Sequence, residues 1–270
     1  MPENTSKLDP GVPLSLHDKV ALITGGSRGI GAATVRLFHQ AGAKVAFSYQ
    51  SAAARANELA AACGGPTQTI PIQHDLNTPE DGQSLIAATV RAFGRIDCLI
   101  VNHGIWPSHD QPINTMPTEQ WRKTLAINLD SSFGLIQAAT AQMLKQPQTG
   151  STRGHIVLIS STAGQRGEAF HADYAASKGA LISLTKSLAT ELIPQGIYCN
   201  CVAPGWVATE MSSEVLKHPD RSKTILSTIP LGRPGHVNEI AGPILFLCTP
   251  LAGFISGEIL NVNGGAVLAG

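Results

Sequence analysis

Short apolar runs alternate along the chain with longer stretches in which apolar residues recur every three or four positions. The short runs are rich in Val and Ile, as strands are, and the longer stretches have the period of helices. The predicted strands cover residues 19–24, 44–49, 69–74, 97–102, 154–160, 197–203 and 258–263. The predicted helices cover residues 29–41, 52–62, 79–93, 117–145 (as one or two helices), 174–193 and 236–248. Strands that are apolar throughout and separated by helices indicate an α/β protein whose parallel sheet is covered on both faces.

Right-handed crossovers between such strands give a Rossmann-like, doubly wound parallel sheet of about seven strands. No domain-scale linker interrupts the pattern, so we expect a flexible leader over residues 1–17 and a single domain over residues 18–270. Residues 205–230 combine Gly, Ser, Thr and Pro with short helical pieces, which favours a mobile substrate lid. Ligands of doubly wound sheets bind at the carboxyl ends of the strands. We therefore expect the functional residues in the segments that follow strands.

The segment "TGGSRGIG" (24–31) follows the first predicted strand and opens the first predicted helix. Its spacing, Gly-x-x-x-Gly-x-Gly from Gly25, differs from the Gly-x-Gly-x-x-Gly fingerprint and from the Walker loop, but it serves the same physical purpose. Gly25 permits a tight turn, Gly29 lets a pyrophosphate approach the backbone, and Gly31 lets the helix pack closely. The helix N-terminus adds free N–H groups for phosphate. The predicted cofactor-binding residues are Gly25, Ser27, Arg28, Gly29, Ile30 and Gly31, and the alternative is a glycine-rich turn without a ligand.

The end of the second predicted strand bears on the choice between NAD and NADP. Folds that take NAD usually place a carboxylate there to hold the ribose hydroxyls, whereas this chain reads "FSYQSAAAR" (47–55) and has no acidic residue before Glu58. The predicted cofactor contacts here are Tyr49 and Ser51, with Ser48, Arg28 and Arg55 nearby. A cation and hydroxyls without a carboxylate suit a 2′-phosphate. The pattern therefore favours NADP(H) over NAD(H). The alternative is that Arg28 is an ordinary surface residue.

Composition argues against several classes of function. The 19 lysines and arginines balance the 19 aspartates and glutamates without a basic stripe, which argues against binding to nucleic acid or to an anionic membrane. No apolar run approaches the ~20 residues of a membrane helix. The five cysteines form no CxxC pair and no metal-ligand spacing, so no metal site is predicted, and Cys199 and Cys201 are expected to share one face of a strand as core residues. An odd number of cysteines without a signal peptide predicts a reducing, cytoplasmic location.

Tyr174 and Lys178 stand four residues apart in "DYAASKGA" (173–180), at the start of a helix whose leucines recur at 181, 184, 188 and 192. The two side chains should lie on one face, one turn apart. At about 100° per residue, Lys178 falls beside the leucine stripe. An ammonium next to a buried face needs a reason, although a core tyrosine and a lysine that reaches to solvent would produce the same spacing.

A set of motifs now points to a family. They are "TGGSRGIG", "DL" (75–76), "NHG" (102–104), Asn128 in "LAINLD", "LISSTAG" (158–164), "YAASK" (174–178) and "CVAPGWVAT" (201–209). With these motifs in this order, the chain resembles the short-chain dehydrogenase/reductase family, in its compact branch, from about residue 17 to the C-terminus. Each motif alone is weak, whereas the ordered set is specific.

The resemblance implies roles for individual residues. Tyr174 would be the catalytic acid/base, and Ser161 would orient and polarise the substrate carbonyl. Lys178 would bind the nicotinamide ribose and lower the pKa of Tyr174, and Asn128 would hold a water in a proton relay to Lys178. The implied cofactor contacts are Asp75 and Leu76 at the adenine, Asn102 and Gly104 at the adenosine ribose, and Pro204, Gly205, Val207 and Thr209 at the nicotinamide, besides Tyr174 and Lys178.

The chemistry is consistent with these roles. Free tyrosine has a pKa of about 10, and lowering it to about 7 requires roughly 4 kcal/mol. One cation at about 4 Å supplies that order of energy at an effective dielectric constant near 20. Two neighbours complicate the pattern: His103 stands where the family usually has alanine, and Ser160 competes with Ser161 for the serine role. We expect His103 to be an ordinary loop histidine, and the spacing to Tyr174 favours Ser161.

The expected substrate wall combines residues 165–173, Trp206, Met211 and 212–230, with Trp106 near. This lining favours a ketone of moderate size with an apolar body, and Arg166 would serve a charged one. The expected function is NADPH-dependent reduction of a ketone, β-keto ester or thioester, as in 3-oxoacyl-carrier-protein reductases. Gln195 replaces a basic residue that often contacts the carrier protein, which leaves docking of that partner open. The alternatives are an NAD-dependent alcohol or polyol dehydrogenase and a catalytically silent nucleotide-binding scaffold. The resemblance further implies a homotetramer.

Overall fold

The computed structural model describes residues 14–148 and 152–269 and places the strands in one parallel sheet. The strands are β1 (Val20–Ile23), β2 (Lys44–Tyr49), β3 (Thr69–Gln73), β4 (Cys98–Val101), β5 (Gly154–Ile159), β6 (Ile197–Pro204) and β7 (Ile259–Val262). They lie in the order β3-β2-β1-β4-β5-β6-β7, and every neighbouring pair is parallel. From β1 the chain adds strands toward one edge of the sheet as far as β3, and from β4 onward it adds them toward the other edge. Doubly wound sheets bind ligands at this switch point between β1 and β4.

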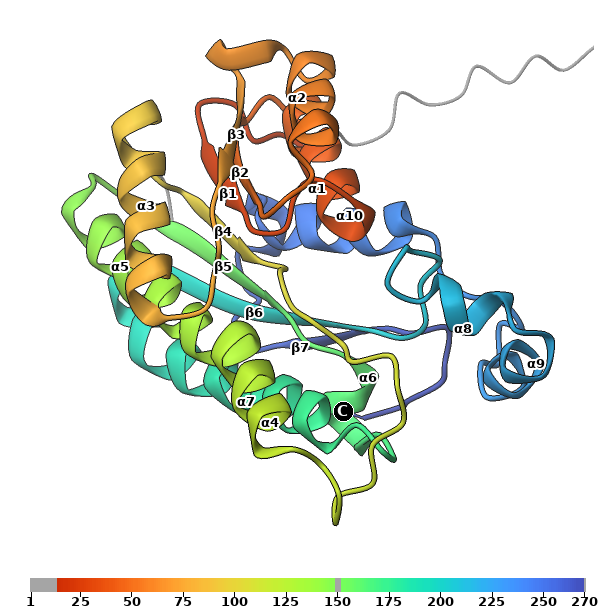
Figure 1. Cartoon of the computed structure of the whole chain (residues 1–270). Coiled ribbons are helices and arrows are strands. Elements are labelled where there is room, and N and C mark those ends of the chain that lie inside the picture. The colour runs from red at the N-terminus through yellow and green to blue at the C-terminus, as the bar shows by residue number, and fades with distance from the viewer. Residues whose placement is uncertain (1–13, 149–151, 270) are drawn as a thin grey trace, which may run out of the picture.

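Helices cover both faces of this sheet (Figure 1). They are α1 (Gly29–Gln40), α2 (Ala53–Ala62), α3 (Pro79–Phe93), α4 (Thr118–Leu125), α5 (Ser131–Lys145), α6 (Thr162–Arg166), α7 (Ala172–Leu192), α8 (Ser213–Lys217), α9 (Pro219–Ser227) and α10 (Val237–Leu247). Helices α1, α2 and α10 lie on one face, and α3, α4, α5 and α7 lie on the other. The predicted doubly wound α/β architecture is thereby confirmed.

The central strands are buried because they supply side chains to two cores. In β1, Ala21 and Ile23 join the core under α1 and α10, whereas Leu22 joins the core under α3, α5 and α7. The same double burial explains why the strands show no alternation of apolar and polar residues. Cys199 and Cys201 are both fully buried in the second core, as their spacing in a strand predicts.

The predicted boundaries agree with the observed ones to within two residues for every predicted strand and for all predicted helices outside 117–145. In that region α4 and α5 are joined by a π-helical segment, Ala126–Asp130, so the stretch is two helices with a wider turn between them. The short helix α6 was not predicted. A π-helical turn leaves a local surplus of backbone and is often found at functional sites.

The predicted leader and the predicted lid lie outside the regular alternation of strands and helices. Residues 1–13 of the predicted leader lie outside the described residues, and its boundary at residue 17 stays a prediction. Near that boundary Leu16 is buried, and its N–H donates to the Ala41 carbonyl at 2.7 Å. The lid region, 205–230, contains α8 and α9, which project away from the sheet (Figure 1). Across the two described stretches of chain, we find no helix with the length and apolarity needed to span a membrane.

Candidate active site

A cavity of about 410 Å³ opens at the carboxyl ends of the strands. Its volume is in the range of small-molecule sites. All but two of the predicted catalytic and cofactor-binding residues line it. These are Gly25, Ser27, Arg28, Gly29, Ile30, Tyr49, Ser51, Asp75, Leu76, Asn102, Gly104, Ser161, Tyr174, Lys178, Pro204, Gly205, Val207 and Thr209. The two that do not line it, Gly31 and Asn128, lie behind its wall, where Gly31 packs against Gly25 and Asn128 lies against Gly104.

The glycine turn is held in a conformation that admits a ligand to the backbone. Gly29 has a φ of +54°, which side chains rarely allow, and a Cβ placed on Gly31 would lie 2.1 Å from the Gly25 carbonyl oxygen. The Ser48 hydroxyl accepts from Gly25 N–H at 3.1 Å, and the Asn102 amide donates to the Thr24 carbonyl at 3.0 Å. Ser48 is therefore a brace for the turn instead of a phosphate contact.

The first turn of α1 is left free for an anion. Arg28 is its N-cap residue, its side chain makes no capping hydrogen bond, and the first turn carries no acidic residue. Free N–H groups and a partial positive charge at this end suit a phosphate. The cradle therefore fits the pyrophosphate of a dinucleotide.

One carboxylate from the lid changes the predicted picture at the adenosine end. Glu210 forms an ion pair with Arg28 at 3.2 Å and a second ion pair with Arg55. Both arginines hold the pKa of the Glu210 carboxyl below its usual value, chiefly through the hydrogen bonds from Arg55 and Arg28. The expectation of cations without a nearby carboxylate is therefore wrong, because the acid arrives from a lid 155 residues further along the chain than Arg55.

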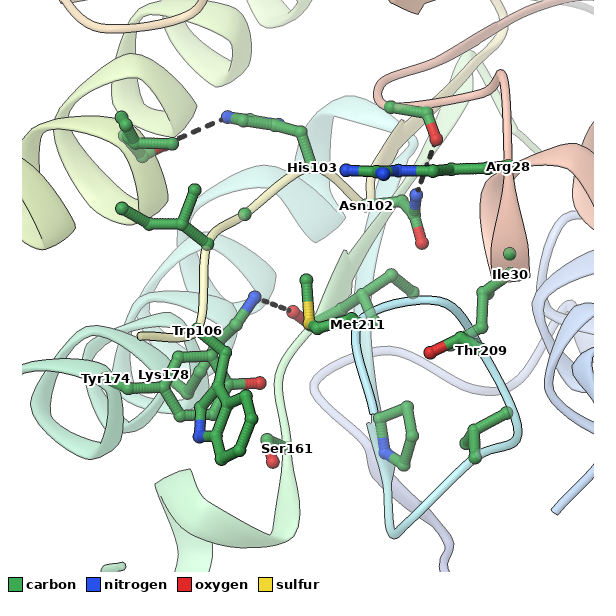
Figure 2. Close-up of a pocket in the computed structure, with 18 of the residues that line it drawn as sticks. Arg28, Ile30, Asn102, His103, Trp106, Ser161, Tyr174, Lys178, Thr209 and Met211 are labelled. Atoms are coloured by element: carbon green, nitrogen blue, oxygen red, sulfur yellow. Dashed lines mark hydrogen bonds between the residues drawn. The ribbon is translucent and has the colours of Figure 1, made fainter. Parts of the chain in front are cut away.

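The Tyr174 phenol and the Ser161 hydroxyl meet at the substrate end of the cavity (Figure 2). Burial raises the pKa of Tyr174 to about 12, and the negative charge of Glu168 adds to the rise, whereas a hydrogen bond with Ser161 opposes it. Ser161 also caps α6 by accepting from Ala163 N–H at 3.1 Å. Tyr174 is thus a neutral phenol near pH 7, ready to give a proton.

Lys178 is buried and points its ammonium at the end of β5. Its Nζ donates to the Ile159 carbonyl at 2.8 Å and lies 5.8 Å from the centre of the Tyr174 ring (Figure 2). Burial lowers the pKa of Lys178 to about 8. Desolvation is the largest influence on the pKa of Tyr174, and the lowering of that pKa by Lys178 stays a prediction.

The position of Lys178 on α7 also differs from the prediction. The buried face of the helix runs through Lys178, Leu181, Thr185, Ala189 and Leu192. Leu184 and Leu188 are only partly buried, and Leu184 borders a shallow groove with Phe133 of α5. Lys178 therefore lies on the buried face of α7 and not beside it. A charged side chain can occupy this position because it borders the cavity at the start of the helix.

Asn128 lies in the π-helical segment and connects it to the cavity wall. Its side-chain oxygen accepts from Ile105 N–H at 2.8 Å, and its amide donates to the Ile105 carbonyl and to the Ser177 hydroxyl, both at 3.0 Å. A Cβ on Gly104 would lie 3.1 Å from the Asn128 oxygen and 3.4 Å from Lys178 Nζ. Asn128 thus fixes the loop that passes over the lysine, while its role in a proton relay stays a prediction.

His103 bridges the glycine turn and the same π-helical segment. Its Nδ1 lies 2.8 Å from the Thr24 hydroxyl, and its Nε2 lies 3.0 Å from the Ile127 carbonyl. Burial lowers the pKa of His103 to about 3, with a further contribution from Lys178. The neutral ring with Nε2 as donor satisfies these contacts, so His103 acts as a structural link.

The neighbour Ser160, the competing serine, donates to the Lys178 carbonyl at 2.7 Å and is buried. Its hydroxyl is committed to packing β5 against α7. Ser161, whose hydroxyl is hydrogen-bonded with Tyr174, is therefore the better placed of the two serines for the predicted role.

The substrate end combines aromatic and charged side chains. Trp106, Trp206, Met211, Arg166 and Glu168 line the cavity. All of these residues belong to the wall predicted from the sequence. The particular role of Glu168, whose charge reaches Tyr174, was not predicted because nothing in its local sequence marks it.

Exposed ion pairs connect the lid to the body near the glycine turn and near the loop after β4. Glu210 pairs with Arg28 and Arg55 near the glycine turn, and Arg221 of α9 lies 3.7 Å from Asp110 in the loop after β4. All these side chains are at least half exposed. Exposed ion pairs contribute little stability, so they are suited to contacts that open and close.

Comparison with known proteins supports the geometric picture. The sequence profile of the family described as Enoyl-(Acyl carrier protein) reductase matches residues 25–267. An L-rhamnose 1-dehydrogenase (NAD(P)(+)) from Azotobacter vinelandii is 38% identical over 93% of this chain and 97% of its own. A 3-oxoacyl-[acyl-carrier-protein] reductase from Synechocystis is also 38% identical, over 94% of this chain and 99% of its own.

Solved structures give the same result. A short-chain dehydrogenase/reductase of the glucose/ribitol dehydrogenase type from Brucella melitensis superimposes with a TM-score of 0.86 at 34% identity, covering 96% of this chain and 100% of its own. A structure from Agrobacterium tumefaciens, assigned as a 2-deoxy-D-gluconate 3-dehydrogenase and holding NADP, gives a TM-score of 0.84 at 30% identity, covering 95% and 99%.

Proposed function

The chain belongs to the short-chain dehydrogenase/reductase family, whose members are NAD(P)-dependent and act on CH–OH and C=O groups, and from this premise we propose that it uses NADPH to reduce a ketone to a secondary alcohol. The neutral Tyr174 phenol beside Ser161 is the observation that carries the proposal. Reduction needs a proton donor at the carbonyl oxygen, and a phenol with a pKa of about 12 keeps its proton at neutral pH.

The residues present fit a dinucleotide. The free end of α1 and the close-packed Gly31 form the pyrophosphate cradle, while Asn102 and Gly104 line the middle of the cavity. Pro204, Gly205, Val207 and Thr209 line the cavity on the lid side, where we place the nicotinamide. The cofactor, when bound, supplies the hydride.

The side chains of this protein orient the substrate carbonyl and supply the proton. The Ser161 hydroxyl holds the carbonyl oxygen within reach of Tyr174 and donates a second hydrogen bond as charge develops on that oxygen. The Tyr174 hydroxyl then transfers its proton to the oxygen, which completes the alcohol. Lys178, already mostly charged near pH 7, stabilises the phenolate that remains and contacts the nicotinamide ribose. Asn128 keeps the Gly104–Ile105 loop over the lysine.

We assign NADP(H) as the favoured cofactor because two arginines, Arg28 and Arg55, converge at the adenosine end and no acidic residue ends β2. Arg28 lines the cavity with Tyr49 and Ser51. Glu210 competes for the same arginines, so the preference depends on the 2′-phosphate displacing this carboxylate. Bound NADP in the Agrobacterium structure is consistent with the assignment.

The test is a panel of ketones and β-keto esters with NADPH and, in parallel, with NADH, followed by the loss of nicotinamide absorbance. The proposal expects turnover of at least one ketone with a higher kcat/KM for NADPH than for NADH. A preference for NADH would overturn the assignment of Arg28 and Tyr49, and the absence of turnover with any ketone would overturn the reductase proposal.

The second candidate is oxidation of an alcohol or polyol on the same site. The Azotobacter relative, an L-rhamnose 1-dehydrogenase, supports this direction. Oxidation runs the same steps in reverse, with the Tyr174 phenolate taking the proton of the alcohol, so a higher pH favours it. A rate with alcohols and NADP⁺ that exceeds the ketone rate at pH 7 would favour this candidate.

We further propose a cytoplasmic homotetramer. A shallow groove between α5 and α7 is lined by Leu129, Phe133 and Leu184, and Phe133 is 50% exposed. Apolar side chains gathered on neighbouring helices favour a partner surface. Light scattering should give four times the chain mass, and a stable monomer would contradict the proposal.

A further inference from the structure

Glu168 places a carboxylate at the substrate end of the cavity. It lies in the loop between α6 and α7, and its side chain is 24% exposed. It lines the cavity together with Ser161 and Tyr174. Its charge acts on the Tyr174 phenol, which places it on the same side of the cavity as the reacting atoms. A carboxylate in this position meets whatever substituent flanks the substrate carbonyl.

The protein leaves much of the hydrogen-bonding capacity of this carboxylate unused. Within residues 14–148 and 152–269, the Trp106 side chain is the hydrogen-bond donor to Glu168, and Nδ1 of His171 lies 3.8 Å away, beyond hydrogen-bond distance. An ionised carboxylate offers about four acceptor positions. Burial raises the pKa of Glu168, against the opposing influence of His171, Trp106 and Arg166. Such a group gains from a ligand that brings hydrogen-bond donors.

Trp106 gives the same part of the cavity a fixed aromatic wall. Its ring stacks on His171 with centroids 4.9 Å apart at an interplanar angle of 15°, and it meets Trp206 edge to face at 5.9 Å. Figure 2 shows Trp106 beside Tyr174 and Ser161 at this end of the cavity. The negative face of an indole attracts the weakly positive C–H groups of a carbon skeleton. A wall of this kind, next to an acceptor, suits a compact skeleton that carries hydroxyl groups.

We infer that the substrate is a polyhydroxylated ketone, linear or cyclic, whose hydroxyl next to the carbonyl donates to the Glu168 carboxylate while its carbon skeleton packs on Trp106. This inference rests on the proposed function and specifies its substrate class. Glu168 is then a specificity-determining residue. An acyl chain brings no donor and leaves the carboxylate without a ligand partner, and an anionic substituent is repelled by it.

The test uses matched pairs of ketones that differ by one hydroxyl: cyclohexanone with 2-hydroxycyclohexanone, and 2-butanone with 1-hydroxy-2-butanone. The kcat/KM of each is measured with NADPH for the wild type and for Glu168→Leu and Glu168→Gln. A hydrogen bond to a charged group is worth about 10- to 100-fold. The wild type should prefer the hydroxylated member of each pair by that factor, Glu168→Gln should keep part of the preference, and Glu168→Leu should abolish it.

The ratio within a pair separates a contact with the substrate from a structural effect, which would lower both rates equally. Glu191→Leu, an exposed position near the C-terminal end of α7 and outside both the cavity lining and the lid, serves as the matched control and should keep the wild-type ratio. Trp106→Phe gives an independent variant: it keeps an aromatic wall, removes the indole N–H, and should reduce the ratio.

Three results would overturn the inference while leaving the reductase proposal intact. The first is a wild type that reduces both members of each pair equally well. The second is a hydroxyl preference that survives Glu168→Leu. A stronger preference for 2-keto acids, lost in Arg166→Ala, would likewise replace the polyhydroxylated class with an anionic one. If no ketone in any pair were reduced, the proposed function itself would fail.

Discussion

Gly31→Ala tests whether the close approach of α1 to the glycine turn creates the cofactor site. The added Cβ would lie 2.1 Å from the Gly25 carbonyl oxygen and 2.8 Å from the Asn102 amide nitrogen, whereas contacts under 3.0 Å are essentially never seen. The helix or the turn must therefore move by about 1 Å, because the nearer contact is with a backbone oxygen that no side-chain rotation can relieve. Overpacking of this kind costs about 1–3 kcal/mol.

The expected effects follow from that displacement. For a domain of this size, a cost near 2 kcal/mol lowers the Tm by about 4–8 °C. A misplacement of about 1 Å that originates away from the reacting groups can still lower kcat/KM roughly 100-fold. NADPH should therefore raise the Tm of the variant much less than it raises that of the wild type, since stabilisation by a ligand depends on its dissociation constant. Thermal unfolding with and without NADPH measures both effects.

Gly242→Ala is the matched control, because it makes the same substitution in α10 with no atom within 4 Å of the added Cβ. Alanine is favoured over glycine inside a helix by about 0.5–1 kcal/mol. We expect an unchanged or slightly higher Tm and wild-type affinity for NADPH. If Gly31→Ala behaved like Gly242→Ala, the cradle would not depend on this packing and the reasoning would be refuted.

Three further predictions concern charge. Glu210→Gln should tighten NADPH binding and leave NADH binding unchanged, because the lid carboxylate competes with the 2′-phosphate for its arginines; equal effects on both cofactors, measured by fluorescence titration, would contradict this. His103 and His155 have folded-state pKa values of about 3 and about 4, below the ordinary 6.5, so the unfolded chain binds more protons as the pH falls below 6.5. Stability should drop by about 3 kcal/mol between pH 7.5 and about pH 5.5, and denaturant unfolding that shows no such loss would be inconsistent with neutral buried rings. Lys178→Ala should weaken NADPH binding and raise the apparent pKa of the rate profile together; if neither changed, the lysine would have no part in the chemistry.

The sheet could be predicted because burial on both faces leaves a direct mark on the sequence. Strands β1 and β4 are apolar at every position, and helices of 10 or more residues separate most of the strands, so the type and the order of the elements could be predicted from the sequence. Leu16 was missed because one apolar side chain in a polar leader carries no period. The short α6 was missed for the same reason.

The sequence predicted which residues line the cavity, but it predicted only part of their electrostatic interactions. Motif residues such as Ser161 and Tyr174 converge on one cavity, as strand exits at one sheet edge require. The ion pairs of Glu210 join residues separated by more than 150 positions, so no local pattern contains them. The pKa of Tyr174 rises because of burial depth, which a spacing of four residues does not encode.

The central claim is that the neutral Tyr174 phenol donates the proton during ketone reduction, and Tyr174→Phe tests it most directly. The variant keeps the ring and its packing, so NADPH should bind as it does to the wild type. The measurement is the single-turnover rate of NADPH oxidation with a saturating ketone. A proton donor contributes about 10²–10⁴-fold, and the account predicts a loss of that size. A Tyr174→Phe variant that bound NADPH normally and reduced the ketone at the wild-type rate would contradict it.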